Sequence, residues 1–327
     1  MNRLSSIAWA AGALAALLML NYFFTPGFFH VEIRDGHLYG SLVDVLNRAA
    51  PVMLLSLGMT LVISTGGIDL SVGSIMAVGG SVAAQVVASG HGGTLAIAAG
   101  LAIGLVAGLA NGAMVAFAGI QPIVATLILM VSGRGIAQLI TDGQPVPFSN
   151  NILEFLGGGF FLSLPFTVTV VVVCALALGQ FVRRTAIGLY LECVGAGPAA
   201  SRLTGIPVPG ILLFAYGICG MFAALAGLLI TSDIKSADAN TTGINLELDA
   251  ILAVVIGGTS LLGGRFTLIG SLIGALLMQS LTTTILSRGV QVEFTQVVKA
   301  VVILVVCMIQ SGPVRERIAS LTKRRTA

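Results

Sequence analysis

Apolar stretches of membrane-spanning length follow one another along almost the whole chain. A transmembrane helix needs about 20 mainly apolar residues, because the hydrocarbon core of a bilayer is roughly 30 Å thick. Hydrophobic residues make up 56% of the chain and charged residues only 9%, whereas a soluble domain carries about 25% charged residues. The sequence therefore predicts an all-α bundle of membrane-spanning helices.

We expect about ten spans in one transmembrane domain that covers residues 1–327, because no polar stretch approaches the ~50 residues of a separate domain. The predicted spans are residues 7–24, 49–65, 74–88, 94–118, 122–140, 164–182, 208–231, 248–262, 266–286 and 295–311. The first span has no small-x-small cleavage site, so we expect an uncleaved helix rather than a signal peptide.

The distribution of positive charge predicts the orientation. Ten spans place both chain ends and the segment 183–206 on one side of the membrane. The lysines and arginines of that side are Arg3, Arg183, Arg184, Arg202, Arg265, Arg315, Arg317, Lys323, Arg324 and Arg325. Because lysine and arginine near span ends favour the cytoplasm, both termini and the basic tail at 313–327 are predicted to be cytoplasmic.

The segment 183–206 carries its own helix signals between two spans. Gly197 and Pro198 predict the start of a short helix, since proline is favoured at the first helical position. Gly205 and Pro207 predict its end. A helix of about two turns, roughly 10 Å long, fits between them. We interpret it as a cytoplasmic docking element; a plain connecting loop is the alternative.

Glycine patterns indicate an internal repeat. The first set is Gly79-Gly80-Ser81 with Gly100 and Gly104, and the second is Gly257-Gly258-Thr259 with Gly270 and Gly274. An offset of five spans reverses the chain direction, so the repeat predicts two inverted halves, a plan that many transporters share. A chance match among the 42 glycines of the chain is the alternative.

The fourth span carries glycine at every fourth position, at residues 100, 104, 108 and 112. Such a ridge of small residues lets two helix backbones approach closely in lipid. Asn111 lies beside the ridge. It is expected either to bond to a neighbouring helix or to face a pathway.

Asp69 is an acid in an otherwise apolar region, which costs a few kcal/mol at the bilayer centre unless the acid is paired or functional. Gly66, Gly67 and Gly73 around it permit a non-helical backbone. Asp69 or Ser71 is expected to cap the helix that follows. A cap with a tight turn is one interpretation, and direct contact with a substrate is the other.

Three motifs carry a family resemblance. They are Gly-Gly-Ile-Asp-Leu-Ser-Val-Gly at 66–73, Gln-Pro-Ile-Val-Ala-Thr-Leu at 121–127 and Leu-Asp-Ala-Ile-Leu-Ala-Val-Val-Ile-Gly-Gly at 248–258. With them, nearly the whole chain resembles the permeases of bacterial sugar ABC importers for ribose, xylose, arabinose or galactofuranose. Residues 47–52, 125–131, 133–135 and 237–240 are most similar to a galactofuranose permease.

The resemblance implies a coupling helix that docks in a groove of a separate ATP-hydrolysing subunit. The positions carried over for ATPase coupling are Glu192, Gly195, Ala199, Ala200, Arg202 and Gly205. Those carried over for a gate or signature motif are Gly67, Asp69, Ser71 and Gly73. Family members usually have a longer polar residue in place of Gly197. The resemblance also implies a second permease subunit, a periplasmic sugar-binding protein and a location in the bacterial inner membrane.

Other polar residues inside spans are candidates for the translocation pathway: Asn111, Gln121, Thr126, Asp249, Thr259 and Gln279. For each of them, a hydrogen bond between helices is the alternative role. A sugar pathway should show few and scattered polar groups, because tight binding would slow release.

The sequence thus predicts the permease subunit of an ATP-driven importer that moves a monosaccharide, with galactofuranose first and ribose or another pentose or hexose next. The chain has no Gly-x4-Gly-Lys-Ser/Thr phosphate loop, so ATP hydrolysis is assigned to a partner. We expect no cofactor, metal or disulfide, because the four cysteines lie far apart. An ion-coupled secondary transporter is the alternative, although most acids lie in external loops. An intramembrane enzyme is disfavoured, since the three histidines lie in external segments.

Overall fold

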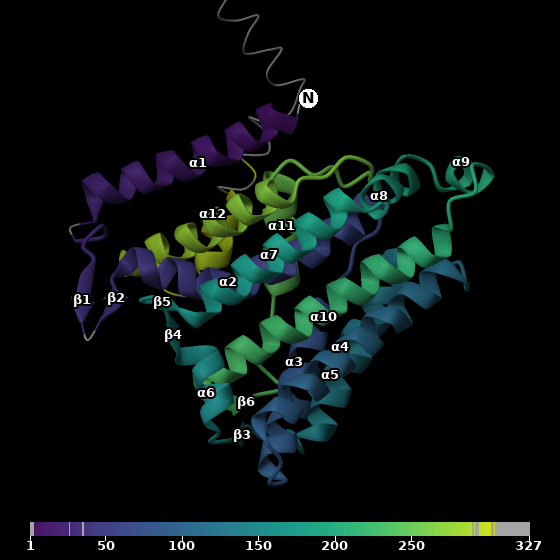
Figure 1. Ribbon diagram of the computed structural model, residues 1–327. Helices are drawn as coiled ribbons and strands as arrows, with labels where there is room; N and C mark the ends of the chain where they lie inside the picture. Colours follow the sequence, from purple (N-terminus) through teal and green to yellow (C-terminus); the bar gives the residue numbers. More distant parts are fainter. Residues whose placement is uncertain are drawn as a thin grey trace, which may run out of the picture.

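The computed structural model describes residues 3–25, 27–34, 36–289, 291, 294–301 and 304, and it is mostly helical (Figure 1). In the described residues, seven helices are long and apolar enough to cross a membrane. The prediction of a membrane helix bundle is therefore confirmed, whereas the prediction of about ten spans is not. Most of the predicted span 295–311, the basic tail 313–327 and Cys307 lie outside the described residues.

The elements follow one another with short connections. The first are α1 (Arg3–Phe24), β1 (Glu32–Arg34), β2 (His37–Tyr39), α2 (Ser41–Ser64), α3 (Val72–Ala88), α4 (Gly93–Ala116) and α5 (Pro122–Ile140). Next come β3 (Val146–Pro147), α6 (Asn151–Gly158), β4 (Phe160–Phe161), β5 (Leu164–Pro165), α7 (Phe166–Arg184), α8 (Ile187–Ala196) and α9 (Pro198–Leu203). The last are α10 (Val208–Ile234), β6 (Ser236–Ala237), α11 (Leu246–Ile256) and α12 (Leu268–Ser287).

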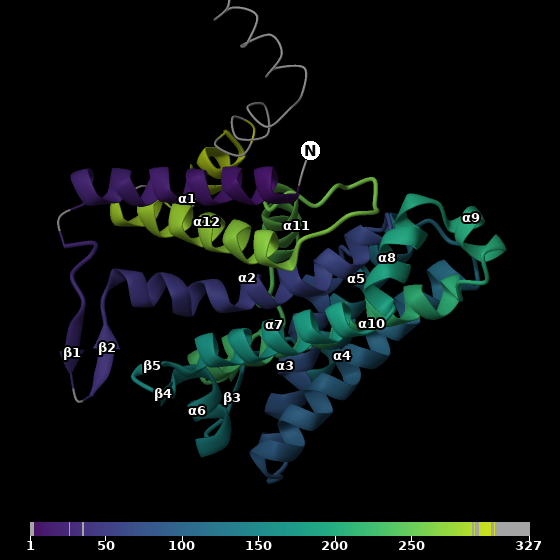
Figure 2. The same cartoon turned by 45° about the horizontal axis from the view of Figure 1, so that its top comes forward.

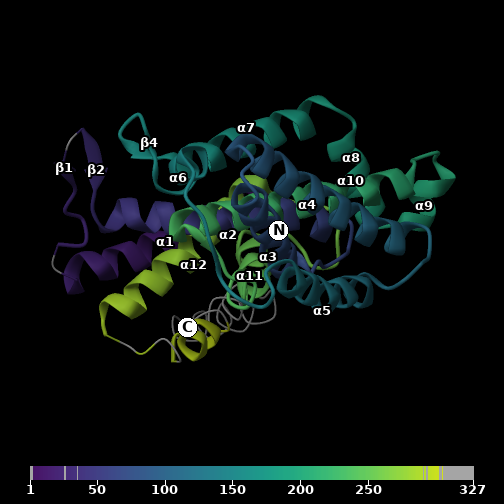
Figure 3. The same ribbon diagram turned by 90° about the horizontal axis from the view of Figure 1, so that it is seen from below.

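The short strands form antiparallel pairs at the ends of the helices. β1 pairs with β2, with Glu32 opposite Tyr39, and β4 pairs with β5. β3 pairs with β6, with Val146 opposite Ala237, which joins the segment after α5 to the segment after α10. Figure 3 shows the β1–β2 hairpin at one end of the bundle and α8 and α9 at the other.

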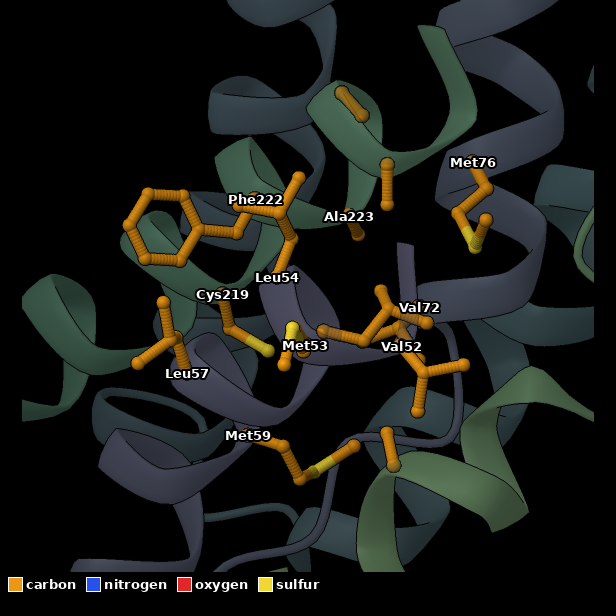
Figure 4. Close-up of a cluster of buried hydrophobic side chains, with 14 of the residues drawn as sticks. Val52, Met53, Leu54, Leu57, Met59, Val72, Met76, Cys219, Phe222 and Ala223 are labelled. Atoms are coloured by element: carbon orange, nitrogen blue, oxygen red, sulfur yellow. The ribbon is translucent and has the colours of Figure 1, made fainter. Parts of the chain in front are cut away.

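Two long helices, α2 and α10, form the centre of the bundle. α2 packs against α10, α11 and α12, while α10 packs against α2, α3 and α4. The buried cluster in Figure 4 joins Leu54 and Met59 of α2 to Val72 and Met76 of α3 and to Phe222 of α10. α1 lies on α12 at the edge of the bundle (Figures 1 and 2).

The glycine ridge of α4 lies directly on α10. A methyl group on Gly108 would overlap the carbonyl oxygen of Tyr216, and one on Gly104 would lie 2.6 Å from the carbonyl oxygen of Gly220. Lipid is as apolar as the helix surfaces, so close van der Waals packing rather than the hydrophobic effect holds such helices together. The prediction of close backbone packing is confirmed.

The two predicted repeat sets both contain a crossing of glycine on glycine. A methyl group on Gly100 of α4 would lie 3.0 Å from the carbonyl oxygen of Gly79 in α3. In the second set, a methyl group on Gly270 of α12 would overlap the carbonyl oxygen of Gly257, which follows α11. The pairs α3–α4 and α11–α12 thus use glycine at corresponding places.

Several boundaries differ from the predictions. α2 begins at Ser41 rather than residue 49, because its first two turns carry polar residues that a search for apolar stretches excludes. α6 lies where a connection was expected, and Asn150 caps it by accepting a hydrogen bond from the Ile152 amide (3.0 Å). The segment 183–206 holds α8 as well as the predicted short helix. That short helix, α9, begins at Pro198 as predicted.

Candidate functional site

The break between α2 and α3 is organised by Asp69, whose side chain is fully buried. Asp69 Oδ1 accepts hydrogen bonds from the Ser71 amide (2.9 Å) and the Ser71 hydroxyl (2.6 Å). The Ser71 side chain itself caps no amide of α3. Of the two residues predicted to cap the helix start, Asp69 is therefore the one that accepts from a backbone amide.

Side chains from α4 and α5 hold this turn in place. Asn111 Nδ2 donates to Ser71 Oγ (2.8 Å), and Asn111 is fully buried. Thr126 Oγ1 lies 3.3 Å from the carbonyl oxygen of Ile68 and 3.0 Å from that of Pro122 in its own helix, so its hydroxyl reaches both acceptors. Of the two roles left open for Asn111, the structure thus shows a bond to a neighbouring element. We call residues Thr65–Ser71 the Asp69 turn.

Buried polar atoms without a hydrogen bond cluster around the Asp69 turn. Within the described residues, Asp69 Oδ2, Asn111 Oδ1 and the Tyr216 hydroxyl are buried and have no hydrogen-bond partner. A methyl group on Gly67 would overlap the Tyr216 hydroxyl, so the turn leaves no room for a side chain there. Burying a polar atom without a hydrogen bond costs free energy, so these three atoms make the turn costly to bury.

At the α9 end of the bundle, three chain segments meet backbone to backbone. The Gly264 amide donates to the carbonyl oxygen of Ser64 (2.8 Å). A methyl group on Gly195 would overlap both of these atoms, and one on Gly263 would lie 2.9 Å from the Gly66 amide nitrogen. We call Ser64, Gly66, Gly195, Gly263 and Gly264 the glycine junction. It joins the end of α8, the start of the Asp69 turn and the connection between α11 and α12.

The helix α9 follows the glycine junction and projects from the bundle. Three predicted coupling residues, Ala199, Ala200 and Arg202, are exposed on this helix. Leu203 at its end is 90% exposed. Gly205 adopts a φ of +83°, which favours glycine and ends the helix where the sequence predicted. Glu192 lies half-buried on α8.

At the opposite end of the Asp69 turn, α3 contacts the connection between β6 and α11. A methyl group on Gly73 would overlap the carbonyl oxygen of Gly243 and lie 2.6 Å from a carboxylate oxygen of Glu247. Arg134 of α5 donates to the carbonyl oxygens of Ala239 (2.8 Å) and Thr242 (2.7 Å). We call residues 238–245 the β6–α11 loop. Arg134 fixes it against α5.

The β6–α11 loop also has an internal bond that acts on an acid outside the spans. The Thr241 hydroxyl donates to Asp238 Oδ2 (2.7 Å). This hydrogen bond lowers the pKa of the Asp238 carboxyl below its usual value, with a smaller contribution from the nearby Arg134 charge. The loop is therefore held by its own side chains as well as by α5.

Replacing Arg134 with methionine is expected to loosen the β6–α11 loop. Hydrogen bonds from a charged group contribute about 1.5–3 kcal/mol each, and the variant removes two of them while keeping an apolar side chain of similar length. We expect at least tenfold faster hydrogen–deuterium exchange of the amides in 238–245. Gln138→Met is the graded control, because it removes one neutral hydrogen bond to the same loop, from Gln138 Nε2 to Asn240 Oδ1 (2.8 Å), and should change the exchange far less. Equal exchange in Arg134→Met and the wild type would contradict this role.

The remaining predicted pathway residues lie in separate places. Gln121 is exposed directly before α5, and Thr259 is buried and accepts from the Thr267 amide (3.3 Å). Asp249 pairs with Lys299 (2.9 Å). Gln279 lines a cavity of about 180 Å³ together with Asn47, Thr167 and Asp233, among others. Asn111 and Thr126 meet at the Asp69 turn, whereas these four do not join them.

Sequence reasoning missed several residues of these sites. Gly263 and Gly264 were not singled out, although a Gly-Gly pair is typical of a turn. Tyr216 was missed too, and its signal was a tyrosine hydroxyl inside an otherwise apolar span. Among the described residues, no group of three or more His, Cys, Asp or Glu side chains could hold a metal ion.

Comparison with known proteins finds a matching family model and several similar permeases. Residues 41–307 match the family model described as branched-chain amino acid transport system / permease component. The galactofuranose transporter permease protein YtfT of Escherichia coli (strain K12) is 48% identical over 311 residues, which cover 95% of this chain and 90% of that protein. No solved structure matches the chain.

Two further relatives have similar coverage. The fructose import permease protein FruF of Bifidobacterium longum (strain NCC 2705) is 41% identical, over 98% of this chain and 92% of that protein. The ribose import permease protein RbsC of Escherichia coli (strain K12) is 37% identical, over 91% of this chain and 92% of that protein.

A membrane helix bundle with these relatives is a transport permease. The chain belongs to the family of branched-chain amino acid transport system permease components. The family description names amino acids, whereas the three relatives are named for sugars. Family membership therefore confirms the predicted transport subunit but does not by itself identify the substrate.

Proposed function

We propose that this chain is the membrane permease subunit of an ATP-binding cassette importer that moves a monosaccharide into the cytoplasm. The observation that carries the proposal is the 48% identity to a galactofuranose permease along 95% of the chain. We infer galactofuranose as the first candidate substrate, and ribose or fructose as the next. The relatives named for these two sugars are less similar to this chain.

The proposed partners supply what this chain lacks. A separate ATPase binds α9, a second permease subunit completes the path, and a periplasmic binding protein delivers the sugar. The geometry at the α9 end supports the first of these assignments. α9 is short, projects from the bundle and begins only three residues after Gly195, which lies against Ser64. A push on α9 is thus transmitted directly to the backbone at the end of α2.

We infer a single permease domain of ten spans in two inverted halves. It lies in a bacterial inner membrane, with both termini in the cytoplasm. The corresponding glycine crossings of α3–α4 and α11–α12 support the two halves. α3 and α11 have only 17 and 11 residues. We assign them as short spans entered from a non-helical turn, which is tolerated at depth where protein covers the backbone.

The motif residues Gly67, Asp69, Ser71 and Gly73 are assigned to a turn that joins the two ends of the protein rather than to the sugar itself. The segment 64–73 contacts the glycine junction at one end and the β6–α11 loop at the other. Alternating access in such transporters is a rigid-body movement of packed elements. A turn that contacts both ends is well placed to move with both.

An ion-coupled secondary transporter is the second candidate function. The observation that favours it is the buried Asp69 carboxyl with one oxygen that accepts no hydrogen bond in the described part of the chain. Buried intramembrane acids are common in proton and ion relays. The two candidates differ in what drives uptake.

Reconstituted transport distinguishes the two candidates. The chain is purified with the ATPase, the second permease subunit and the binding protein from the same gene neighbourhood and incorporated into liposomes. Uptake is measured with labelled ribose, fructose and galactose, whose solutions contain some of the furanose form. We expect uptake that requires ATP. It should stop when the phosphate-loop lysine of the ATPase is replaced, because that lysine holds the ATP phosphates. Uptake driven by a proton or sodium gradient without any ATPase would overturn the proposal.

A further inference from the structure

The connection between α11 and α12 has an exposed apolar tip. Leu262 is 89% exposed and Leu261 is also exposed, with Ser260 before them and Arg265 after them at the surface. Figures 1 and 2 show this connection reaching from α11 towards α8. Exposed apolar groups with a polar rim are typical of interaction sites.

The tip is fixed in place by the glycine junction. Gly263 and Gly264 adopt φ values of +86° and +88°, which only glycine adopts readily. Their backbone lies against Gly195, and the Gly264 amide bonds to Ser64. Leu262 is therefore held beside the end of α8, and α9 begins three residues after Gly195. The two most exposed leucines of this end, Leu203 and Leu262, lie on neighbouring projections.

A protein partner fits this tip better than lipid hydrocarbon. Irregular backbone in the hydrocarbon region leaves polar groups unsatisfied, at a cost of several kcal/mol for each group. The exposed Arg265 beside the leucines would add the cost of a charge in that region. A protein surface can cover two leucines and still hydrogen-bond to the rim.

We propose that Leu261 and Leu262 form a second contact for the ATPase subunit, adjacent to its contact with α9. This inference rests on the proposed function, in which the ATPase binds α9. The argument is continuity: the tip and α9 are joined through the glycine junction, so a partner that covers α9 lies next to the tip. The second contact connects the ATPase to α11 and α12, whereas α9 connects it to α8 and α10.

Site-specific photo-crosslinking tests the second contact. A photoreactive phenylalanine analogue replaces Leu262, Leu203 or Leu162 in the full chain, which is co-expressed with the ATPase from its gene neighbourhood. Leu162 is the control, because it is 83% exposed but lies between β4 and β5. We expect ATPase adducts from positions 262 and 203 and none from position 162.

The other outcomes separate the two proposals. Adducts from position 203 alone would overturn the second contact and leave the proposed function in place. Adducts from neither position would overturn both. Adducts of position 262 with lipid alone would assign the tip to the membrane surface and overturn the second contact.

A substitution provides an independent measurement. Leu262→Ser is expected to lower the amount of ATPase that co-purifies with the chain at least tenfold, while Leu162→Ser leaves it unchanged. The melting temperature of each variant in detergent shows whether the chain is folded. A folded Leu262→Ser variant that retains the ATPase fully would overturn the inference.

Discussion

Alanine at Gly195 is expected to abolish most of the transport activity of this chain. The added methyl group would overlap the Ser64 carbonyl oxygen and the Gly264 amide nitrogen. Both are backbone atoms, so no side chain can rotate to make room. Overpacking costs roughly 1–3 kcal/mol even where side chains can adjust. We therefore expect a lower melting temperature and the loss of most of the uptake, because the backbone contact between the end of α8 and the end of α2 is displaced.

Gly197→Ala is the matched control for this prediction. Gly197 lies two residues further along the same segment, and its φ of 179° is extended backbone that any residue adopts. A methyl group there would lie 3.8 Å from the Ala200 side chain, which is an ordinary contact. ATP-driven uptake in proteoliposomes and the melting temperature are measured for both variants. Wild-type uptake by Gly195→Ala would show that the glycine junction does not depend on close packing.

The success of the sequence-based predictions depended on how local each signal was. The start of α9 was predicted correctly, because proline at the first helical position and glycine after the end act within a few residues. The close backbone packing at the glycine ridge of α4 was also predicted correctly, since its period of four residues is a property of one helix. The contact of Gly195 with Ser64 and Gly264 could not be predicted from the sequence, because it joins segments far apart in the chain.

The polar residues inside the spans show a second limit of the sequence. A hydrogen bond between helices and a place in a pathway require the same side-chain types, so composition does not separate them. The structure places Asn111 and Thr126 against the Asp69 turn, and it pairs Asp249 with Lys299. Bonding between elements of the bundle therefore accounts for these three contacts: two join a helix to the turn, and one is an ion pair.

Asp69→Ala is expected to destabilise the protein strongly. The variant removes the acceptor of both the Ser71 amide and the Ser71 hydroxyl in a fully buried place. A buried donor that loses its partner costs about 1–3 kcal/mol, so the free energy of unfolding should fall by roughly 2–4 kcal/mol. The Asn111 bond to Ser71 depends on the same hydroxyl and should weaken as well. Thermal unfolding in detergent and ATP-driven uptake measure the two effects.

Asp69→Asn separates a structural role from a role in ion coupling. The amide oxygen of asparagine can still accept both hydrogen bonds from Ser71. Its nitrogen replaces Oδ2, which accepts no hydrogen bond within the described residues. If Asp69 holds the turn, the free energy of unfolding of the variant should lie within about 1 kcal/mol of the wild-type value, because no donor loses its partner. The variant should also retain most of the uptake. If the carboxyl instead carries a proton or cation, Asp69→Asn should remain folded but lose transport. Because asparagine cannot ionise, that result would favour the secondary transporter over a chain driven through α9.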